Sequence, residues 1–231
     1  MAIYIIVAAI AYLLGSIPFG YILLRVFRGE DVRQHGSGNI GATNVARKAP
    51  GLGIATLVLD ALKGYAAVAV GMQLANVSLT HTGITGTREQ VEAVLRAQGA
   101  SIQGAYLVAA IAAVFAILGH VFPIWLKFKG GKGAATGVGA FVALAPKAVL
   151  VVLVIFAVLV AVFRYISLGS IVATAAFPVC AWLLYRNQAS PAVFAAMVAA
   201  AAIIILKHQQ NIRRLLAGTE QRFELKHRTE H

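Results

Sequence analysis

The sequence has few cysteine and acidic residues, and these shortages exclude several kinds of site. Its 231 residues include one cysteine, Cys180, so the chain can form no intrachain disulfide and offers no cysteine-rich metal site. Cys180 lies in an apolar run and is interpreted as a small buried residue. Only eight residues are Asp or Glu, and no HxxH, HExxH or Asp-rich stretch occurs. The sequence therefore predicts no metal ion and no other cofactor.

Charged residues of either sign are also rare. They make up 12% of the chain, whereas 60% of the chain is hydrophobic. In soluble domains about 25% of residues are charged and about 45–50% are apolar. The excess apolar surface predicts lipid as the surrounding solvent. The net charge of +12 lies at the ends of apolar segments. It therefore indicates membrane topology, anionic lipid headgroups and an anionic substrate, and no nucleic acid partner.

Long apolar runs follow one another with short gaps, and no charged residue precedes Arg25. A cleaved signal peptide carries Lys or Arg before a short apolar core, so the first run is expected to be an uncleaved span. A bilayer core takes roughly 20 residues of helix. The chain is therefore predicted to be an all-α integral membrane bundle of seven transmembrane helices. The expected spans are Ile3–Leu24, Leu52–Leu74, Ala105–Leu126, Ala134–Ala145, Ala148–Phe163, Ser170–Tyr185 and Ala192–Leu206.

The run from Ala134 to Phe163 decides the number of spans. As one helix it would measure about 45 Å at about 1.5 Å per residue, too long for an ordinary crossing. Pro146 and Lys147 lie near its centre. Proline interrupts the helical hydrogen bonds, and lysine is costly at mid-bilayer. We therefore split the run into two spans, the first of which is short, with a re-entrant segment as the alternative.

The basic residues give the orientation. With seven spans, 15 of the 20 Lys and Arg residues fall on one side, in loops 25–51, 127–133 and 164–169 and in the tail 207–231. Cytoplasmic loops carry the excess of Lys and Arg. The N-terminus is therefore predicted outside and the C-terminus in the cytoplasm.

The whole chain, residues 1–231, is predicted to form one membrane-embedded domain. Segment 76–104 is polar and forms a long outer loop, in which Thr87–Ala97 is expected to be a short amphipathic surface helix. Residues 221–231 are expected to be a cytoplasmic tail.

The first candidate binding loop is GSGNIGATNVAR at residues 36–47. Its glycines let the backbone approach a ligand, and successive N–H groups in such loops bind anions. Hydroxyl and amide side chains add neutral donors, and the arginine adds a fork that matches phosphate. A flexible loop rich in turn-forming residues is the alternative. The predicted substrate-binding residues here are Gly38, Asn39, Thr43, Asn44 and Arg47, and Ser37 adds a hydroxyl donor.

The second candidate loop is KFKGGKGAATG at residues 127–137, which leads directly into an expected span. A helix N-terminus has free N–H groups and the positive end of the dipole, so it attracts anions. The alternative is a lysine cluster that anchors the preceding span, but anchoring does not require the glycines. The predicted phosphate-binding residues here are Lys129, Gly130, Gly131, Lys132, Gly133 and Thr136.

The third stretch, Lys207–Glu220, is expected to continue the last span as a helix. His208, Asn211 and Leu215 then share one face, so the first two reach a site below the bundle. The alternative is a basic flank that stops membrane transfer, in which the histidine is solvated.

Further polar residues lie inside or beside the spans. Asp60 and Lys63 are expected to pair and face the bundle interior, as an internal structural pair and not as catalytic groups. Ser167 and Ser170 flank the start of the sixth span; they are candidates to donate to the same site, although serines there are ordinarily caps.

These loops, in this order and with these spans between them, resemble the PlsY family of bacterial acyl-phosphate:glycerol-3-phosphate acyltransferases. The resemblance covers nearly the whole chain, although segment 76–104 and the tail after Glu220 are longer than the family pattern. The matching stretches are GSGNIGATNVAR (36–47), GHVFPIWLKFKGGKGAATG (119–137), HQQNIRRLLAGTE (208–220), SIPFG (16–20) and LDALKG (59–64).

The resemblance implies transfer of a fatty acyl group from acyl phosphate to the 1-hydroxyl of sn-glycerol 3-phosphate. The products are lysophosphatidic acid and phosphate, in the first step of bacterial phospholipid synthesis. It places the protein in the bacterial inner membrane, with a cytoplasmic active site, membrane lipid around it and a soluble acyl-phosphate-forming enzyme as a partner. The His–Asp pair of the common glycerolipid acyltransferases is absent, since no histidine is followed five residues later by aspartate.

The resemblance also implies roles for individual residues. Ser37 and Arg47 are expected to be essential, Ser37 as a catalytic residue, and Lys132 with its glycines is expected to bind glycerol 3-phosphate. His208 and Asn211 are expected to contribute to the reaction centre, and Glu220 to hold the structure together. The general base is His208 or, by preference, a substrate phosphate oxygen.

Two rival interpretations come from the residues alone. A transporter for phosphorylated metabolites fits the short fourth span and its Gly-rich entry. A non-catalytic basic scaffold that gathers anionic lipid fits the charge.

Overall fold

The structure is a computed structural model and describes residues 2–80, 87–97, 102–186 and 190–223. Over these residues the regular elements are helices, and no strand occurs among them. The α-helices are α1 (Ala2–Gly15), α2 (Phe19–Arg28), α3 (Ala42–Lys48), α4 (Pro50–Thr80), α5 (Arg88–Ala97), α6 (Ile102–Val121), α7 (Ala134–Val142), α8 (Pro146–Phe163), α9 (Ile166–Tyr185), α10 (Pro191–Lys207) and α11 (Gln209–Leu216), with 3-10 turns η1 (Val32–Gln34) and η2 (Ile124–Leu126).

The first span is broken where we expected one continuous helix. α1 ends at Gly15 and α2 begins at Phe19. Pro18 explains the break, because proline has no N–H and its ring clashes with the carbonyl four residues earlier. The two helices still form one apolar segment, Ala2–Arg28, that is long enough to cross a membrane.

The predicted split around Pro146 is confirmed. α7 ends at Val142, and α8 begins with Pro146 at its first turn, where the missing N–H of proline costs nothing. α7 has nine residues, so it measures only about 14 Å at about 1.5 Å per residue, roughly half of a bilayer core.

Five helical segments in the described part of the chain are long and apolar enough to cross a membrane, or six if the bent pair α10 and α11 counts as one span. The five are Ala2–Arg28, Pro50–Ala75, Gln103–Leu126, Pro146–Phe163 and Ile166–Tyr185. The remaining predicted span, the fourth, corresponds to the short helix α7. The count of seven and the orientation of the termini therefore stay predictions.

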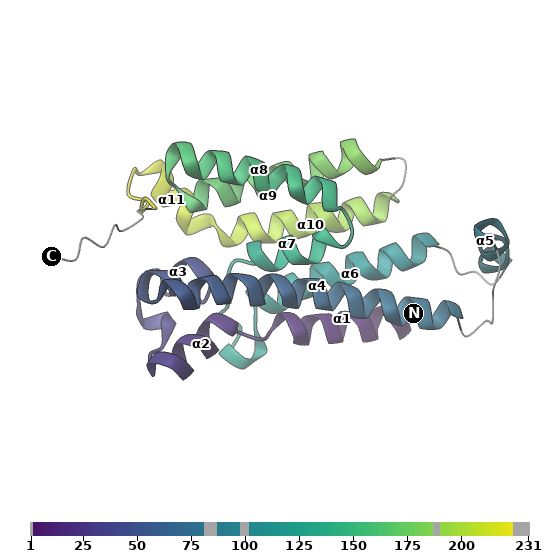
Figure 1. The fold of residues 1–231 in the computed structure, drawn as a ribbon, viewed down its shortest axis with the longest axis horizontal. Coiled ribbons are helices and arrows are strands. Elements are labelled where there is room, and N and C mark those ends of the chain that lie inside the picture. Colours follow the sequence, from purple (N-terminus) through teal and green to yellow (C-terminus); the bar gives the residue numbers. More distant parts are fainter. Residues whose placement is uncertain (1, 81–86, 98–101, 187–189, 224–231) are drawn as a thin grey trace.

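The helices form an elongated bundle of two layers (Figure 1). α1, α4 and α6 pack against one another in one layer, whereas α8, α9 and α10 form the other. α7 lies between the layers and packs on α4, and α10 packs on α6. α2, α3 and α11 lie together at one end of the bundle, and α5 lies at the opposite end.

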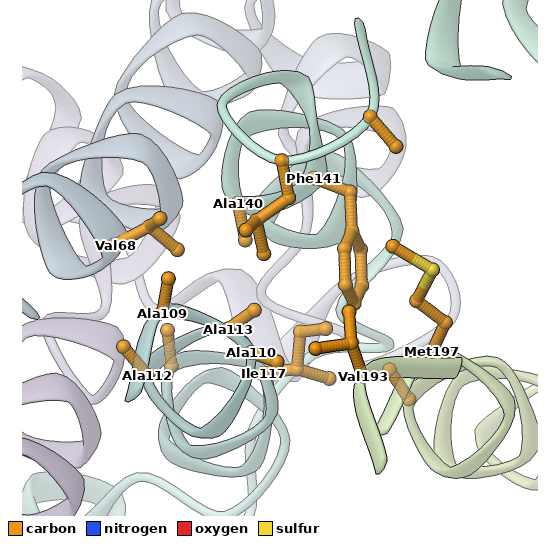
Figure 2. Close-up of a cluster of buried hydrophobic side chains, with 14 of the residues drawn as sticks. Val68, Ala109, Ala110, Ala112, Ala113, Ile117, Ala140, Phe141, Val193 and Met197 are labelled. Atoms are coloured by element: carbon orange, nitrogen blue, oxygen red, sulfur yellow. The ribbon is translucent and has the colours of Figure 1, made fainter. Parts of the chain in front are cut away.

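Small residues allow the layers to approach closely. α6 contributes the buried alanines Ala109, Ala110, Ala112 and Ala113 to the core (Figure 2). At Gly139 of α7 an added Cβ would collide with the backbone carbonyl of Ala61 in α4, so only glycine fits there. Helices in lipid usually associate through close contact of small residues. Lipid tails are as apolar as the side chains, so the hydrophobic effect does not drive the helices together.

The outer segment contains the short helix expected from its pattern, since α5 covers Arg88–Ala97. α4 extends beyond its predicted end as far as Thr80. Residues 81–86 and 98–101 of this segment, and residues 224–231 of the predicted tail, lie outside the described residues.

Candidate active site

Three segments that are far apart in sequence meet at the end of the bundle that carries α2, α3 and α11 (Figure 1). They enclose a cavity of about 120 Å³. It is lined by Ser37, Asn39, Gly130, Lys132, Lys207, Gln209, Gln210, Asn211 and Arg214. All three candidate stretches contribute, so the structure brings them together at one cavity, and a shared site stays a prediction.

Asn44 holds the first loop in shape. Its Oδ1 accepts a hydrogen bond from the Ser37 N–H at 3.1 Å, and its Nδ2 donates to the carbonyls of Val32, His35 and Asn39 at 2.9–3.1 Å. The side chain is buried, so these bonds occupy the amide that was predicted to face substrate. Asn44 therefore acts on the cavity through Ser37 and Asn39.

The other residues of the first loop are accessible. Ser37 is exposed at the cavity wall, and its hydroxyl has no hydrogen-bond partner among the described residues. Gly38 has φ +68°, which places the chain in the region that favours glycine. Thr43 and Arg47 are exposed on α3 and do not line the cavity. Arg47 is nevertheless close enough to Lys132 for its positive charge to lower the pKa of that lysine.

The glycines of the second loop close the end of α6. The N–H groups of Gly130 and Gly131 donate to the carbonyls of Val121 and His120 at 3.2 and 3.0 Å. These two N–H groups are thus used inside the protein, which the sequence did not reveal. Gly133, with φ +88°, is the residue that starts α7.

Lys132 is the cation of this loop that reaches the cavity. Burial lowers its pKa to about 8; the positive charges of Arg214 and Arg47 add to this effect, and the Glu220 carboxylate opposes it. Lys129 is exposed and lies outside the cavity wall. A lysine next to other cations favours a bound anion, because the anion removes the repulsion.

Thr136 lies in the first turn of α7 and is fully buried. Its Oγ1 has no hydrogen-bond partner among the described residues, and it does not line the cavity. The structure therefore places this predicted phosphate-binding residue in the protein interior and not in the cavity lining.

The expectation that residues 207–220 continue the last span as one helix is wrong. α10 ends at Lys207, and α11 begins at Gln209 with its axis bent by 57°. The break lies at His208, whose φ and ψ of −91° and 5° depart from the helical values. The bend turns α11 across the end of the bundle, so Gln209, Gln210 and Asn211 all reach the cavity.

His208 is buried beside this cavity. Its Nδ1 lies 2.8 Å from the Ile204 carbonyl oxygen, which can only accept, so Nδ1 carries the proton and Nε2 carries the lone pair. Burial, together with the positive charge of Lys132, lowers the pKa of His208 to about 4. The ring is therefore neutral near pH 7.

Glu220 ties the C-terminal stretch to α11. Its Oε1 accepts from Asn211 Nδ2 at 2.7 Å, and its Oε2 accepts from Arg214 Nε at 2.6 Å. Burial alone would raise the pKa of Glu220, but Ser167, Asn211 and Arg214 outweigh burial and hold it below its usual value. These two contacts support the structural role expected of Glu220, which stays a prediction.

The two serines of α9 differ in their surroundings. Ser170 Oγ donates to the Ile166 carbonyl at 2.9 Å, which satisfies it within the helix. Ser167 is buried close to Glu220, although its Oγ has no partner in hydrogen-bonding geometry among the described residues. Neither serine lines the cavity.

A second polar cluster is sealed inside the bundle. Lys63 Nζ lies 2.7 Å from Asp60 Oδ1 and also donates to the Ile17 carbonyl, at the break between α1 and α2. The predicted Asp60–Lys63 pair is therefore present and buried. His120 of α6 joins it, with Nδ1 3.6 Å from Asp60 Oδ1. A Cβ added at Gly131 would collide with His120 Nε2, so this ring packs directly below the second loop.

Sequence reasoning missed several residues of these two clusters. His120 lies inside an apolar run. An ionisable residue at membrane depth usually faces the bundle interior and has a polar partner there, so its position could have indicated this cluster. Lys207, Gln209, Gln210 and Arg214 line the cavity. Their placement depends on the bend at His208, for which the sequence gives no proline or glycine signal.

A sequence profile of the glycerol-3-phosphate acyltransferase family matches residues 5–218. The chain belongs to this family. The glycerol-3-phosphate acyltransferase of Syntrophotalea carbinolica is 42% identical over 97% of the chain and 100% of its own length. The enzyme of Trichlorobacter lovleyi is 44% identical over 93% of the chain and 94% of its own length.

Two solved structures of the integral membrane glycerol 3-phosphate acyltransferase PlsY are similar to this acyltransferase. The glycerol 3-phosphate form is 32% identical, covers 96% of both chains and has a TM-score of 0.75. The lysophosphatidic acid form is 31% identical, covers 96% of this chain and 95% of its own, and has a TM-score of 0.72. The predicted PlsY family membership is thus confirmed. The chain is a membrane-embedded acyltransferase of phospholipid synthesis, and the transporter and scaffold interpretations are wrong.

Proposed function

We propose that this acyltransferase moves a fatty acyl group from acyl phosphate to the 1-hydroxyl of sn-glycerol 3-phosphate. The products are lysophosphatidic acid and phosphate. The observation that carries the proposal is the convergence of three loops with donors and cations on one polar cavity. Two anionic substrates need such a set of groups, which offset their mutual repulsion.

The bond changes are simple. The glycerol hydroxyl oxygen bonds to the acyl carbonyl carbon, the bond from that carbon to the phosphate oxygen breaks, and phosphate leaves with the electron pair. The hydroxyl proton goes to a phosphate oxygen. Because acyl phosphate is an activated mixed anhydride, the enzyme has mainly to bring the two substrates together and stabilise charge.

Each loop has a part in this account. Ser37 offers a free hydroxyl to orient a reacting group, while Asn44 and the glycines fix the backbone on which it stands. Lys132 binds the phosphate of glycerol 3-phosphate, and Arg47 adds positive charge nearby. Asn211, held by Glu220, presents its amide to the cavity.

The low pKa of His208 supports substrate phosphate as the base. An efficient general base has a pKa near the working pH. With a pKa of about 4, His208 is a weak base, whereas a phosphate monoester has a second pKa of about 6. The neutral ring instead offers its Nε2 lone pair as a hydrogen-bond acceptor. A rate that follows one enzyme group over pH, and loses that dependence in His208→Gln, would overturn this assignment.

We propose that the reaction needs no metal ion. Nowhere in residues 2–80, 87–97, 102–186 and 190–223 do three or more His, Cys, Asp or Glu side chains gather as metal ligands. The cations around the cavity, Lys132 and Arg214 among them, take over the charge stabilisation.

We also propose seven spans, with the N-terminus outside and the cavity facing the cytoplasm of a bacterial inner membrane. The excess of Lys and Arg on the cavity side supports this orientation. α7 then enters the bundle from the cytoplasmic face without reaching the other side alone. A soluble enzyme that forms acyl phosphate would supply the donor. The donor partitions between membrane and cytoplasm, because its acyl chain is apolar and its phosphate is charged.

The donor is tested with purified protein and three mixtures. Palmitoyl phosphate with glycerol 3-phosphate should give phosphate and lysophosphatidic acid in equal amounts, in the presence of a metal chelator. Palmitoyl phosphate alone should release little phosphate, and palmitoyl-CoA with glycerol 3-phosphate should give no product. Activity with palmitoyl-CoA only would contradict the donor assignment, and loss of activity with the chelator would contradict metal independence.

A further inference from the structure

Arg214 and Lys207 are the two cations at the cavity that no sequence pattern assigned to substrate, and Arg214 is the one held by a carboxylate. It lies in α11 and lines the cavity, and its side chain is 36% exposed. Nε donates to Glu220 Oε2 at 2.6 Å. Within the described residues, neither Nη1 nor Nη2 donates a hydrogen bond. One edge of the guanidinium is thus anchored, and the remaining donors are free.

The helix geometry sets Arg214 apart from its neighbour. Asn211 and Arg214 are three residues apart, so they share a face of α11, and both bind the same carboxylate of Glu220. Arg213 is exposed and does not line the cavity. One arginine is therefore oriented toward the site, and the next one in sequence provides a matched control.

The charges around Arg214 are unbalanced. Arg214 and Arg47 both lie close enough to Lys132 to lower its pKa, whereas Glu220 is the carboxylate that acts in the other direction. Glu220 already accepts from both Asn211 and Arg214. Lys132, Lys207 and Arg214 line the cavity, so these cations outnumber the one committed carboxylate, and a dianionic phosphate would neutralise the excess positive charge.

A guanidinium also differs from an ammonium in how it binds phosphate. Two N–H groups of arginine reach two phosphate oxygens at once, whereas lysine acts as a point charge. With Nε fixed by Glu220, Arg214 loses little rotamer freedom on binding.

We propose that Arg214, oriented by Glu220, binds the phosphate of glycerol 3-phosphate together with Lys132. This rests on the proposed function, which assigns glycerol 3-phosphate to this cavity. The competing explanation is structural: Arg214 serves only to neutralise Glu220 and hold the C-terminal stretch.

The test measures binding of glycerol 3-phosphate to the full chain by calorimetry, with no acyl donor, and then steady-state kinetics. Arg214→Gln is expected to raise the Kd and the KM for glycerol 3-phosphate about 10- to 100-fold, as for other hydrogen bonds to charged groups. The KM for palmitoyl phosphate should change less than about threefold. Arg213→Gln should leave all three values unchanged, and Arg214→Lys should recover only part of the loss.

A double variant separates binding from structure. If Arg214 only neutralises Glu220, then Arg214→Gln with Glu220→Gln should restore the affinity for glycerol 3-phosphate. The proposal predicts that affinity stays low in this double variant, while its thermal unfolding temperature recovers. Restored affinity, or an Arg214→Gln protein with lower kcat and unchanged Kd, would overturn the proposal.

The binding measurement also separates this inference from the proposed donor. If the wild type binds glycerol 3-phosphate but palmitoyl phosphate is no donor, only the proposed reaction fails. If palmitoyl phosphate reacts normally in Arg214→Gln with an unchanged KM for glycerol 3-phosphate, only the role of Arg214 fails.

Discussion

The protein has two charged clusters that are used in opposite ways. Inside the bundle, Asp60, Lys63 and His120 lie sealed among apolar helices, and the charges of Asp60 and Lys63 are paired. At the cavity, Lys132 and Arg214 lie with more positive than negative charge around them. A cluster whose charges pair with one another stabilises the fold, whereas a cluster whose hydrogen-bond donors lack protein partners can bind a ligand.

The two clusters are physically connected. The His120 carbonyl accepts a hydrogen bond from the Gly131 N–H, and the His120 ring fills the space below that glycine. The next residue along, Lys132, lines the cavity. The sealed cluster therefore supports the loop that carries the free charge, and variants in the two clusters should separate stability from activity.

The largest effect should follow Asp60→Ala. It leaves Lys63 buried without its carboxylate, which costs about 3–5 kcal/mol, so little folded protein should remain. Thermal unfolding in detergent measures this. The exposed pair of α5 is the control, since Glu92→Ala breaks a contact with Arg96 that is worth at most about 0.5 kcal/mol. Equal unfolding temperatures in the two variants would remove the distinction between the clusters.

The next largest effect should be on catalysis alone. Lys132→Met should lower kcat/KM about 10²- to 10³-fold while the unfolding temperature stays close to that of the wild type. Lys127→Met changes an exposed lysine of the same loop that does not line the cavity, and should retain activity. A large loss of stability in Lys132→Met would mean that this lysine belongs with the sealed cluster.

Asn44 joins both behaviours and should give an intermediate result. Asn44→Ala removes hydrogen bonds to the Val32, His35 and Asn39 carbonyls, with an expected cost of about 1–3 kcal/mol. Activity should fall as well, because Ser37 loses its support. Gln34→Ala, an exposed amide in the same segment, should change neither property. Full activity in Asn44→Ala would show that the loop keeps its shape without it.

The smallest effect is a dependence on pH. Lys132 is charged below its pKa of about 8 and neutral above it, so kcat/KM for glycerol 3-phosphate should fall up to tenfold per pH unit above about pH 8. Lys132→Arg stays charged and should lose this alkaline limb. A limb that persists in Lys132→Arg would have to come from another group.

Much of the architecture could be predicted from sequence because its causes are local. Pro146 ends one helix and starts the next, and the Gly-rich loops fall between apolar runs. Segments with motif residues at the ends of consecutive spans were expected to meet, and they do.

The remainder depends on packing that no local pattern records. The bend at His208 has no proline or glycine, so α11 was expected to continue α10. Gly130 and Gly131 were predicted to bind phosphate, but α6 ends beside them and its carbonyls accept their N–H groups. His120 lies far from Asp60 in sequence, and only the contact of α4 with α6 brings them together.

The central claim is that three separate loops build one reaction site, and the rate of lysophosphatidic acid formation tests it directly. With palmitoyl phosphate as donor, Ser37→Ala, Lys132→Met and Asn211→Ala should each lower the rate by at least about 10²-fold, with unfolding temperatures near that of the wild type. A wild-type rate in a folded variant of any one loop would mean that this loop does not belong to the site.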